Sequence, residues 1–315
     1  MNEFEKALQV IAEVKKAVLG KDECIVKCVA AILAGGHILL NDIPGVGKTT
    51  LAVALARAMS LESGRVQFTP DVMPTDLVGF SIYRKETNSF EYQPGSIMCN
   101  IFLADELNRT SPKTQSALLE VMEEGQVTVD GATRPVPDPF VVIATQNPFG
   151  SAGTQLMPES QLDRFMVCMT MGYPSMEDEL AILKGEHRNR RVQPVITARE
   201  LQQLKAAVEA VYIKDEVYEY VARLADRTRN HEEIALGLSP RGTLCLAAMA
   251  RSLAFLRQRD YVIPADVLDI APAVMGHRLM PKRRGAHEAA QEELVSGILR
   301  EVKRPAVLGG KGRKA

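Results

Sequence analysis

The stretch that decides the fold is Asn41-Asp42-Ile43-Pro44-Gly45-Val46-Gly47-Lys48-Thr49-Thr50, which lies between an apolar segment, His37–Leu40, and a helical pattern, Leu51–Ala56. Glycines in such a loop let backbone N–H groups turn inward at the N-terminus of the following helix, where they bind phosphate. Lys48 can then reach the β and γ phosphates of a nucleotide, and the Thr49 hydroxyl can coordinate Mg²⁺. Gly-Lys-Thr alone is a weak motif, but the order of strand, loop and helix favours a phosphate-binding loop over an ordinary turn.

Further apolar segments of strand length are Val66–Phe68, Ile101–Ala104, Val141–Ala144 and Phe165–Met169. Nearly unbroken apolar strands with helical patterns between them are typical of a parallel sheet that is covered by helices on both faces. The first half of the chain is therefore predicted to be an α/β domain with three layers.

Polar side chains directly follow two of these segments. Asp105 and Glu106 come after Ile101–Ala104, and the sheet would deliver both carboxylates to the phosphate loop. There Asp105 would hold Mg²⁺ through its water shell and Glu106 would polarise an attacking water. An acidic pair after a strand is usually solvated loop, but together with Lys48 it indicates a Walker B motif. The segment Thr145-Gln146-Asn147 places an amide where it could orient the same water.

The second half of the chain has only helical periods after Gly172-Tyr173-Pro174-Ser175, where Pro174 blocks a helix and Ser175 can cap the next one. We expect an α/β domain over 1–173, an all-helical domain over 174–302 and a basic, glycine-rich, mobile tail over 303–315. The tail is interpreted as a frayed terminus, with an anion-binding role as the alternative. The predicted helices are Met176–His187, Ala198–Val211, Asp215–Arg229, Pro240–Arg257, Pro264–Met275 and Ala286–Val302.

Composition narrows the classes of protein. The 315 residues suggest two domains, at roughly 100–200 residues each. The net charge of -1, 5% aromatic residues and absence of Trp do not favour a nucleic-acid-binding protein. The N-terminus lacks the pattern of a signal peptide, and the most apolar stretch, Cys28–Asn41, is too short to span a bilayer. The 5 cysteines support neither a disulfide framework nor a zinc site, so we expect the reducing cytoplasm.

Together these motifs resemble the AAA+ ATPases, and the residues between them narrow the resemblance to the MoxR family over nearly the whole chain. The resemblance implies Mg²⁺-dependent ATP hydrolysis by a homo-oligomer, usually a hexameric ring. It also implies chaperone-like remodelling, maturation or cofactor and metal insertion of a partner, often one with a von Willebrand factor A domain. The segments that carry the resemblance are Ile43–Thr49, Gln67–Asp71, Asp105–Arg109, Ala144–Pro148 and Leu162–Phe165.

The resemblance also implies roles for individual residues. Asn147 is similar to the sensor 1 residue, Arg164 to an arginine finger that acts on a neighbouring subunit, and Arg241 to the sensor 2 residue. The segment Val18-Leu19-Gly20-Lys21 resembles the one that contacts adenine, with Leu19 and Gly20 as the binding residues. The alternatives are a surface ion pair for Arg164, a first-turn helix position for Arg241 and a plain loop for Leu19 and Gly20. The implied nucleotide-binding residues of the loop are Pro44, Gly45, Val46, Gly47, Lys48, Thr49 and Thr50.

Two insertions resemble those of the family and are predicted to face the client, with purely structural excursions as the alternative. They are residues 69–95 and the segment Glu124–Gly131, whose alternation and Asp130-Gly131 turn predict a β-hairpin. Asp42 stands where the Gly-x-x-x-x-Gly-Lys-Thr pattern has its first glycine, which leaves ATP affinity open. Two rival functions also stay open: an AAA+ motor that acts on nucleic acid, and a nucleotide switch without efficient hydrolysis.

Overall fold

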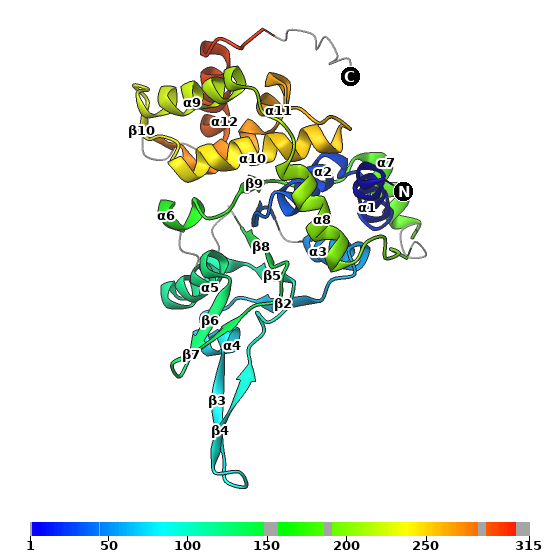
Figure 1. Ribbon diagram of the computed structural model, residues 1–315, viewed down its shortest axis with the longest axis vertical. Coiled ribbons are helices and arrows are strands. Elements are labelled where there is room, and N and C mark those ends of the chain that lie inside the picture. The colour runs from blue at the N-terminus through cyan, green and yellow to red at the C-terminus, as the bar shows by residue number, and fades with distance from the viewer. Residues whose placement is uncertain (1, 44, 148–156, 186–190, 283–287, 307–315) are drawn as a thin grey trace. The chain divides into compact units, whose positions relative to one another are not determined.

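The computed structural model describes residues 2–43, 45–147, 157–185, 191–282 and 288–306. The chain divides into two compact units, Met1–Ala207 and Val208–Ala315 (Figure 1). Among the described residues, no helix combines the length and the apolar character needed to cross a membrane.

A five-stranded parallel sheet forms the centre of the first unit, with strand order β2-β5-β8-β1-β9. The strand β1 lies between β8 and β9, whereas the chain continues from β1 to β2 at the far edge. This change of direction is a topological switch point, where α/β sheets bind ligands beyond the carboxyl ends of their strands. The strands are β1 (Ile38–Asn41), β2 (Ser63–Gln67), β5 (Ile101–Asp105), β8 (Val141–Gln146) and β9 (Val167–Met169).

Helices cover this sheet and bury its apolar side chains. The helix α1 packs against α2 and α3, and the core beside α5 contains Phe102, Leu118 and Phe165, each fully buried. Burying such a side chain contributes about 1.5–3 kcal/mol. The helices of this unit are α1 (Glu3–Ala17), α2 (Asp22–Leu33), α3 (Lys48–Ala58), α4 (Pro74–Val78), α5 (Pro112–Glu124), α6 (Glu159–Leu162), α7 (Met176–Leu183) and α8 (Ala198–Glu209), with the 3₁₀ turn η1 (Leu107–Arg109).

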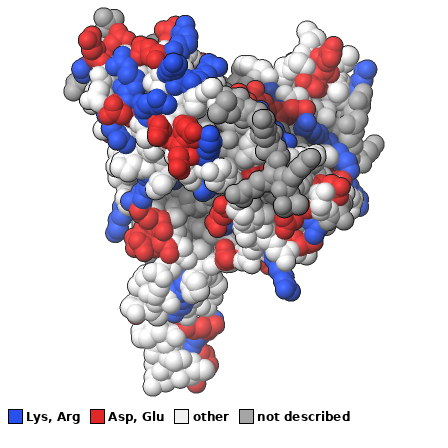
Figure 2. Space-filling model, turned by 45° about the horizontal axis from the view of Figure 1, so that its top comes forward, with Lys and Arg blue, Asp and Glu red and all other residues white. Residues whose placement is uncertain are grey.

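Two β-hairpins extend from the first unit. The segment predicted to be a hairpin forms β6 (Gln126–Val129) and β7 (Ala132–Pro135), and the turn residues Asp130 and Gly131 both have positive φ, as a type I′ turn requires. The 69–95 insertion contains β3 (Gly79–Arg84) and β4 (Ser89–Pro94), which project away from the sheet (Figure 1). Acidic and basic side chains lie on this projection among uncharged ones (Figure 2). Its exposed apolar side chains are Phe80, Ile82, Tyr83 and Phe90.

The second unit is a helical bundle with one small antiparallel sheet, in which β10 (Ile234–Leu236) pairs with β11 (Met280–Pro281). The helical periods in the sequence did not reveal this pair. Leu246, Phe255 and Ile270 are buried between helices. The helices are α9 (Asp215–Arg229), α10 (Pro240–Leu256), α11 (Pro264–Met275) and α12 (Glu288–Glu301), with the 3₁₀ turn η2 (Gly276–Arg278).

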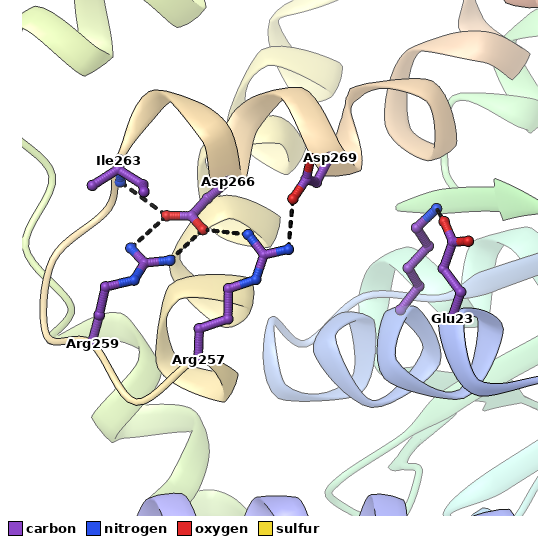
Figure 3. A network of polar contacts seen from close by, with 7 residues as sticks. Glu23, Arg257, Arg259, Ile263, Asp266 and Asp269 are labelled. Carbon is purple, nitrogen blue, oxygen red and sulfur yellow. Dashed lines mark hydrogen bonds and ion pairs between the residues drawn. The ribbon is translucent and has the colours of Figure 1, made fainter. Parts of the chain in front are cut away.

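A network of charged groups fixes the start of α11 (Figure 3). The Asp266 carboxylate is fully buried and accepts hydrogen bonds from Arg257, from both terminal nitrogens of Arg259 and from the backbone N–H of Ile263. Arg257 also pairs with Asp269 at 2.6 Å. The bond from Ile263 satisfies an otherwise unpaired N–H at the helix N-terminus.

The two units divide between Ala207 and Val208, later in the chain than the predicted boundary at 173/174. The reason is that the segment after β9 makes its contacts with the first unit. The N–H groups of Val195 and Ile196 donate to the Ala58 carbonyl, and Lys6 pairs with Glu200 at the start of α8. Three parts of these predictions lie outside the described residues. They are the predicted end of a helix at His187, the predicted start of a helix at Ala286, and residues 307–315 of the predicted tail.

Candidate nucleotide-binding site

The phosphate loop connects β1 to α3, as the sequence predicts. Gly45 and Gly47 have φ of 89° and 98°, a left-handed region that favours glycine, and Gly47 caps the helix that begins at Lys48. Val46 and Thr49 are half-buried, whereas Gly45 and Thr50 are exposed. Pro44 lies outside the described residues.

The Lys48 side chain turns back into its own loop. Its Nζ donates to the carbonyl oxygens of Asp42 at 2.8 Å and Ile43 at 3.0 Å. Burial lowers the pKa of the Lys48 ammonium group, while the charges of Asp42, Asp105 and Glu106 oppose this change. The loop lysine and the carboxylates that follow β5 therefore lie close enough to interact electrostatically.

Asp42 does not direct its carboxylate into the loop. Its two oxygens accept hydrogen bonds from the N–H groups of Met171 and Gly172, which follow β9, and the residue is 5% exposed. Its backbone N–H bonds to the Gln146 carbonyl at the end of β8. The charge at the position of the missing glycine thus joins the loop to the segment that follows β9, while the backbone of Asp42 joins it to β8.

The ends of β5 and β8 are joined through one hydroxyl group. Thr145 Oγ1 donates to Asp105 Oδ1 and accepts the backbone N–H of Glu106, both at 2.8 Å. The other Asp105 oxygen, Oδ2, pairs with Arg65 of β2 at 2.8 Å. Sequence reasoning assigned no role to Thr145 or Arg65, because their contacts depend on how the strands align across the sheet.

Glu106 adopts an unusual backbone conformation and has a cationic partner. Its φ of 56° and ψ of 48° lie in the left-handed region, which costs about 1–3 kcal/mol for such a residue. Its Oε2 accepts from Arg109 Nη1 at 2.6 Å across η1. Arg109 was part of the family motif in the sequence but had no assigned role.

Asn147, the predicted sensor 1 residue, directly follows β8. The preceding Gln146 pairs with Asn41 of β1, the residue at which the phosphate loop begins. Asn147 therefore lies at the same edge of the sheet as Lys48 and Asp105.

The predicted adenine segment lies beside the chain that leaves β9. A Cβ atom on Gly20, whose φ is 67°, would collide with the Asp178 carboxylate of α7. Lys21 Nζ donates to the Tyr173 carbonyl at 2.6 Å. Since Met171 and Gly172 bind Asp42, the same short segment contacts both the phosphate loop and the neighbourhood of Leu19 and Gly20.

Arg164 contacts α5 instead of the phosphate loop. Its Nη1 donates to the Leu119 carbonyl at 2.7 Å and pairs with Glu123 at 2.8 Å. The side chain is 31% exposed and lines a groove with Ser116 and Gln161. Arg241 is the second residue of α10, after the Ser239 cap and Pro240, and belongs to the second unit.

Oxygen donors suited to Mg²⁺ are present in the first unit. The described residues contain no group of three His, Cys, Asp or Glu side chains that could hold a metal alone. Mg²⁺ usually keeps several waters and binds one or two protein oxygens plus substrate phosphates. Among the described residues, Asp105 Oδ1 accepts one hydrogen bond, from Thr145, and Oδ2 accepts one, from Arg65, so lone pairs remain for such a shell. The Thr49 hydroxyl and the Asp105 carboxylate fit this group.

Comparisons with known proteins agree with this geometry. The sequence model of the ATPase family associated with various cellular activities (AAA) matches residues 37–167, and that of the AAA lid domain matches residues 226–297. The chain is 46% identical to the YeaC protein of Bacillus subtilis over 94% of this chain and 93% of that one. It is 38% identical to Chaperone MoxR1 of Mycobacterium tuberculosis over 94% of this chain and 82% of that one.

A solved structure has the same fold. The crystal structure of a candidate ATPase from Cytophaga hutchinsonii superposes with a TM-score of 0.87 at 36% identity and covers 96% of both chains. The second unit thus contains the helical lid of such proteins. With the strand order, the phosphate loop and the acidic pair already described, these matches show that the chain belongs to the MoxR family of AAA+ ATPases.

Proposed function

We propose that this protein hydrolyses ATP with Mg²⁺ and uses the energy to remodel a partner protein. The observation that carries the proposal is that the phosphate loop with Lys48 and the end of β5 with Asp105 and Glu106 lie at the same edge of the parallel sheet. Lys48 and the loop N–H groups would bind the phosphates, and Thr49 and Asp105 would hold Mg²⁺, which neutralises charge on the phosphates.

Glu106 would polarise the attacking water in this reaction, and Asn147 would help to orient it. The left-handed backbone and the Arg109 contact determine where the Glu106 carboxylate lies before substrate binds. For Glu106 to accept a proton from water, its carboxylate has to leave Arg109 or share an oxygen with it.

Two variants test the proposal. Lys48→Ala removes the loop's cation, so ATP affinity measured by calorimetry should fall below detection. Glu106→Gln keeps the size of the side chain but removes its charge, so ATP should still bind while kcat falls by about 10²–10⁴. Glu91→Gln is the matched control, because Glu91 is also paired with an arginine, Arg84, but lies on the projecting hairpin. Unchanged ATP affinity in Lys48→Ala, or unchanged kcat in Glu106→Gln, would contradict the proposal.

We further propose a ring, usually of six subunits in this family, in which Arg164 acts on the nucleotide of a neighbour. Its contacts with α5, away from Lys48, support this role. Arg164→Ala should bind ATP but hydrolyse it about 10³–10⁵ times more slowly. Co-expression with Lys48→Ala should restore partial activity, because mixed rings contain some complete sites. Mixed assemblies confirmed by mass spectrometry that show no activity would refute this arrangement.

Arg241 is proposed to couple the lid to the nucleotide as sensor 2. Its place in the first turn of α10 supports this, since a phosphate contact there would tie the helix to the nucleotide state. Arg241→Ala should weaken ATP binding more than ADP binding, which calorimetry with both nucleotides measures. If Arg241→Ala weakened the binding of ATP and of ADP by the same factor, a contact between Arg241 and the γ-phosphate would be excluded.

The partner is proposed to be a protein, often one with a von Willebrand factor A domain in this family, and the name of the chaperone relative supports remodelling. The exposed apolar side chains of the β3–β4 hairpin support contact with such a client. Phe90→Ser should weaken binding of a purified partner without changing basal ATPase activity. We also propose a reducing, cytoplasmic location, because in the described part of the chain the thiols of Cys24, Cys28, Cys99, Cys168 and Cys245 are not joined in disulfides.

A further inference from the structure

Thr145 occupies a central place between the motifs of the proposed site. In β8 its backbone pairs with Leu40 of β1, two residues before Asp42, while the preceding residue, Ala144, pairs with Ala104 of β5. Its side chain is fully buried. The residue is therefore held between the strand that leads into the phosphate loop and the strand that ends at the acidic pair.

The directions of both hydrogen bonds of the Thr145 hydroxyl are fixed by chemistry. The Glu106 N–H can only donate, and the ionised Asp105 carboxylate can only accept. The hydroxyl must therefore accept from Glu106 and donate its single proton to Asp105, and both bonds measure 2.8 Å. Such a chain of bonds polarises each member and holds both partners in one arrangement.

The consequences of these bonds differ for the two acidic residues. For Asp105, the bond fixes the rotation of the carboxylate and leaves its remaining lone pairs available. For Glu106, the bond holds the backbone N–H of a residue whose φ is 56°. Such a left-handed conformation persists only when the surrounding structure imposes it. Moving that backbone would move the Glu106 side chain away from Lys48 and the phosphates.

We propose that Thr145 is the positioning residue that sets Asp105 for Mg²⁺ and Glu106 for the attacking water. The inference rests on the proposed ATPase function. Thr145 touches neither substrate nor metal in this proposal and acts only through the two residues that do. Partners of this kind orient metal ligands in many proteins, and their loss typically costs about 10–100-fold in metal affinity or activity.

Substitutions that change only the hydroxyl test this role. Thr145→Val keeps the shape and removes both bonds, whereas Thr145→Ser keeps the hydroxyl. The matched control is Thr228→Val in the second unit, because Thr228 is also fully buried, donates to the Ala225 carbonyl at 2.6 Å and accepts the Leu238 N–H at 2.9 Å. Thermal unfolding of all variants separates loss of stability from loss of function.

The expected result is a split between nucleotide binding and turnover. Thr145→Val should lower kcat by about 10–100-fold at saturating ATP and Mg²⁺. Calorimetry should show wild-type ATP affinity in EDTA but a smaller gain in affinity when Mg²⁺ is added. Thr145→Ser should restore most of kcat and of the Mg²⁺ effect, while Thr228→Val should lower only the unfolding temperature.

Several results would overturn the role of Thr145. Wild-type kcat in Thr145→Val, or a serine variant as impaired as the valine variant, would show that the hydroxyl is not what positions the acidic pair. If Thr145→Val does not fold, Thr145→Ala and Thr145→Ser make the same comparison, since they differ by one oxygen. Failure of the ATPase proposal itself is distinct: wild type would then hydrolyse no ATP, or Lys48→Ala would bind ATP normally.

Discussion

Two buried aspartates, one in each unit, show how a site differs from a structural network. Asp266 in the lid is 0% exposed and its oxygens accept four hydrogen bonds, from Arg257, Arg259 twice and Ile263. Asp105 is 8% exposed and accepts two from the part of the chain that the structure describes, one from Thr145 and one from Arg65. A carboxylate has about four lone-pair positions, so the first is saturated and the second is half-filled.

Unused acceptor capacity, more than burial or charge, distinguishes the carboxylate that can bind a ligand. Both aspartates lie near arginines, and a count of nearby charges would rank Asp266 higher. The charge of Asp105 also acts on the buried ammonium group of Lys48. The comparison can be tested with variants of both aspartates.

The largest expected effect on stability belongs to Asp266→Asn. Removing one member of a buried ion pair leaves the remaining charge uncompensated, which costs about 3–5 kcal/mol. Arg257 and Arg259 are 42% and 20% exposed, so we expect the low end of that range. Urea unfolding followed by circular dichroism measures the change, and ATP affinity should stay at the wild-type value. A loss below about 1 kcal/mol would mean that the saturated network is not structural.

Asp105→Asn should show the opposite pattern. Its stability should stay close to wild type, because the amide oxygen of the asparagine can still accept from Thr145 and the half-exposed Arg65 can turn to water. Turnover should fall on the order of 100-fold, or about 2.7 kcal/mol in activation free energy, since a charge that holds Mg²⁺ is lost. Steady-state kinetics over a Mg²⁺ titration measures the loss. If Asp105→Asn were destabilised as much as Asp266→Asn with normal turnover, the contrast between the two aspartates would be wrong.

Acid should weaken the first unit through His37. Burial lowers the pKa of His37 from its ordinary value of 6.5 to about 4. The unfolded chain therefore takes up the proton first, so stability is full above pH 6.5 and falls as the pH drops toward 4, by at most about 1.4 kcal/mol per pH unit. Urea unfolding at several pH values measures the slope, and His37→Gln should flatten it. An unchanged slope in that variant would assign the acid sensitivity to other groups.

The smallest effect is expected for Arg65→Gln. The Arg65 side chain is 51% exposed, so its ion pair with Asp105 should contribute less than about 1 kcal/mol to stability. Its guanidinium occupies one Asp105 oxygen and competes with a divalent cation for the carboxylate. Half-maximal ATPase activity should therefore need less Mg²⁺ in this variant. A higher Mg²⁺ requirement would instead indicate that Arg65 helps to hold the carboxylate in place.

Much of the fold could be predicted from local sequence patterns. Strand β5 and the acidic pair at its end were predicted because the apolar run Ile101–Ala104 stops at two charged residues, Asp105 and Glu106. Helices α9 and α11 begin and end at the predicted residues, because Asp215 and Pro264 are typical starts of helices and their apolar periods are regular. These signals are contained within about 15 neighbouring residues of one helix or strand.

The partners within the site could not be predicted in this way. Arg65 and Asp105 are 40 residues apart, and Thr145 and Asp105 are also 40 apart, so their contacts depend on strand order and register. The orientation of Asp42 depends on Met171 and Gly172, which are about 130 positions later in the chain. Local propensity contains no information on such pairs, since each is made only when the sheet assembles.

The bonds of Asp42 also provide a spectroscopic reporter. Met171 and Gly172 lie outside the phosphate loop, in the segment that follows β9. Their amide protons nevertheless bond to the Asp42 carboxylate, which belongs to the loop. Glycine amides give well-separated signals in nitrogen-proton correlation spectra, and a bond to a charged acceptor shifts them strongly. A titration with nucleotide could therefore follow the loop by watching the Gly172 resonance, with no label placed inside the loop.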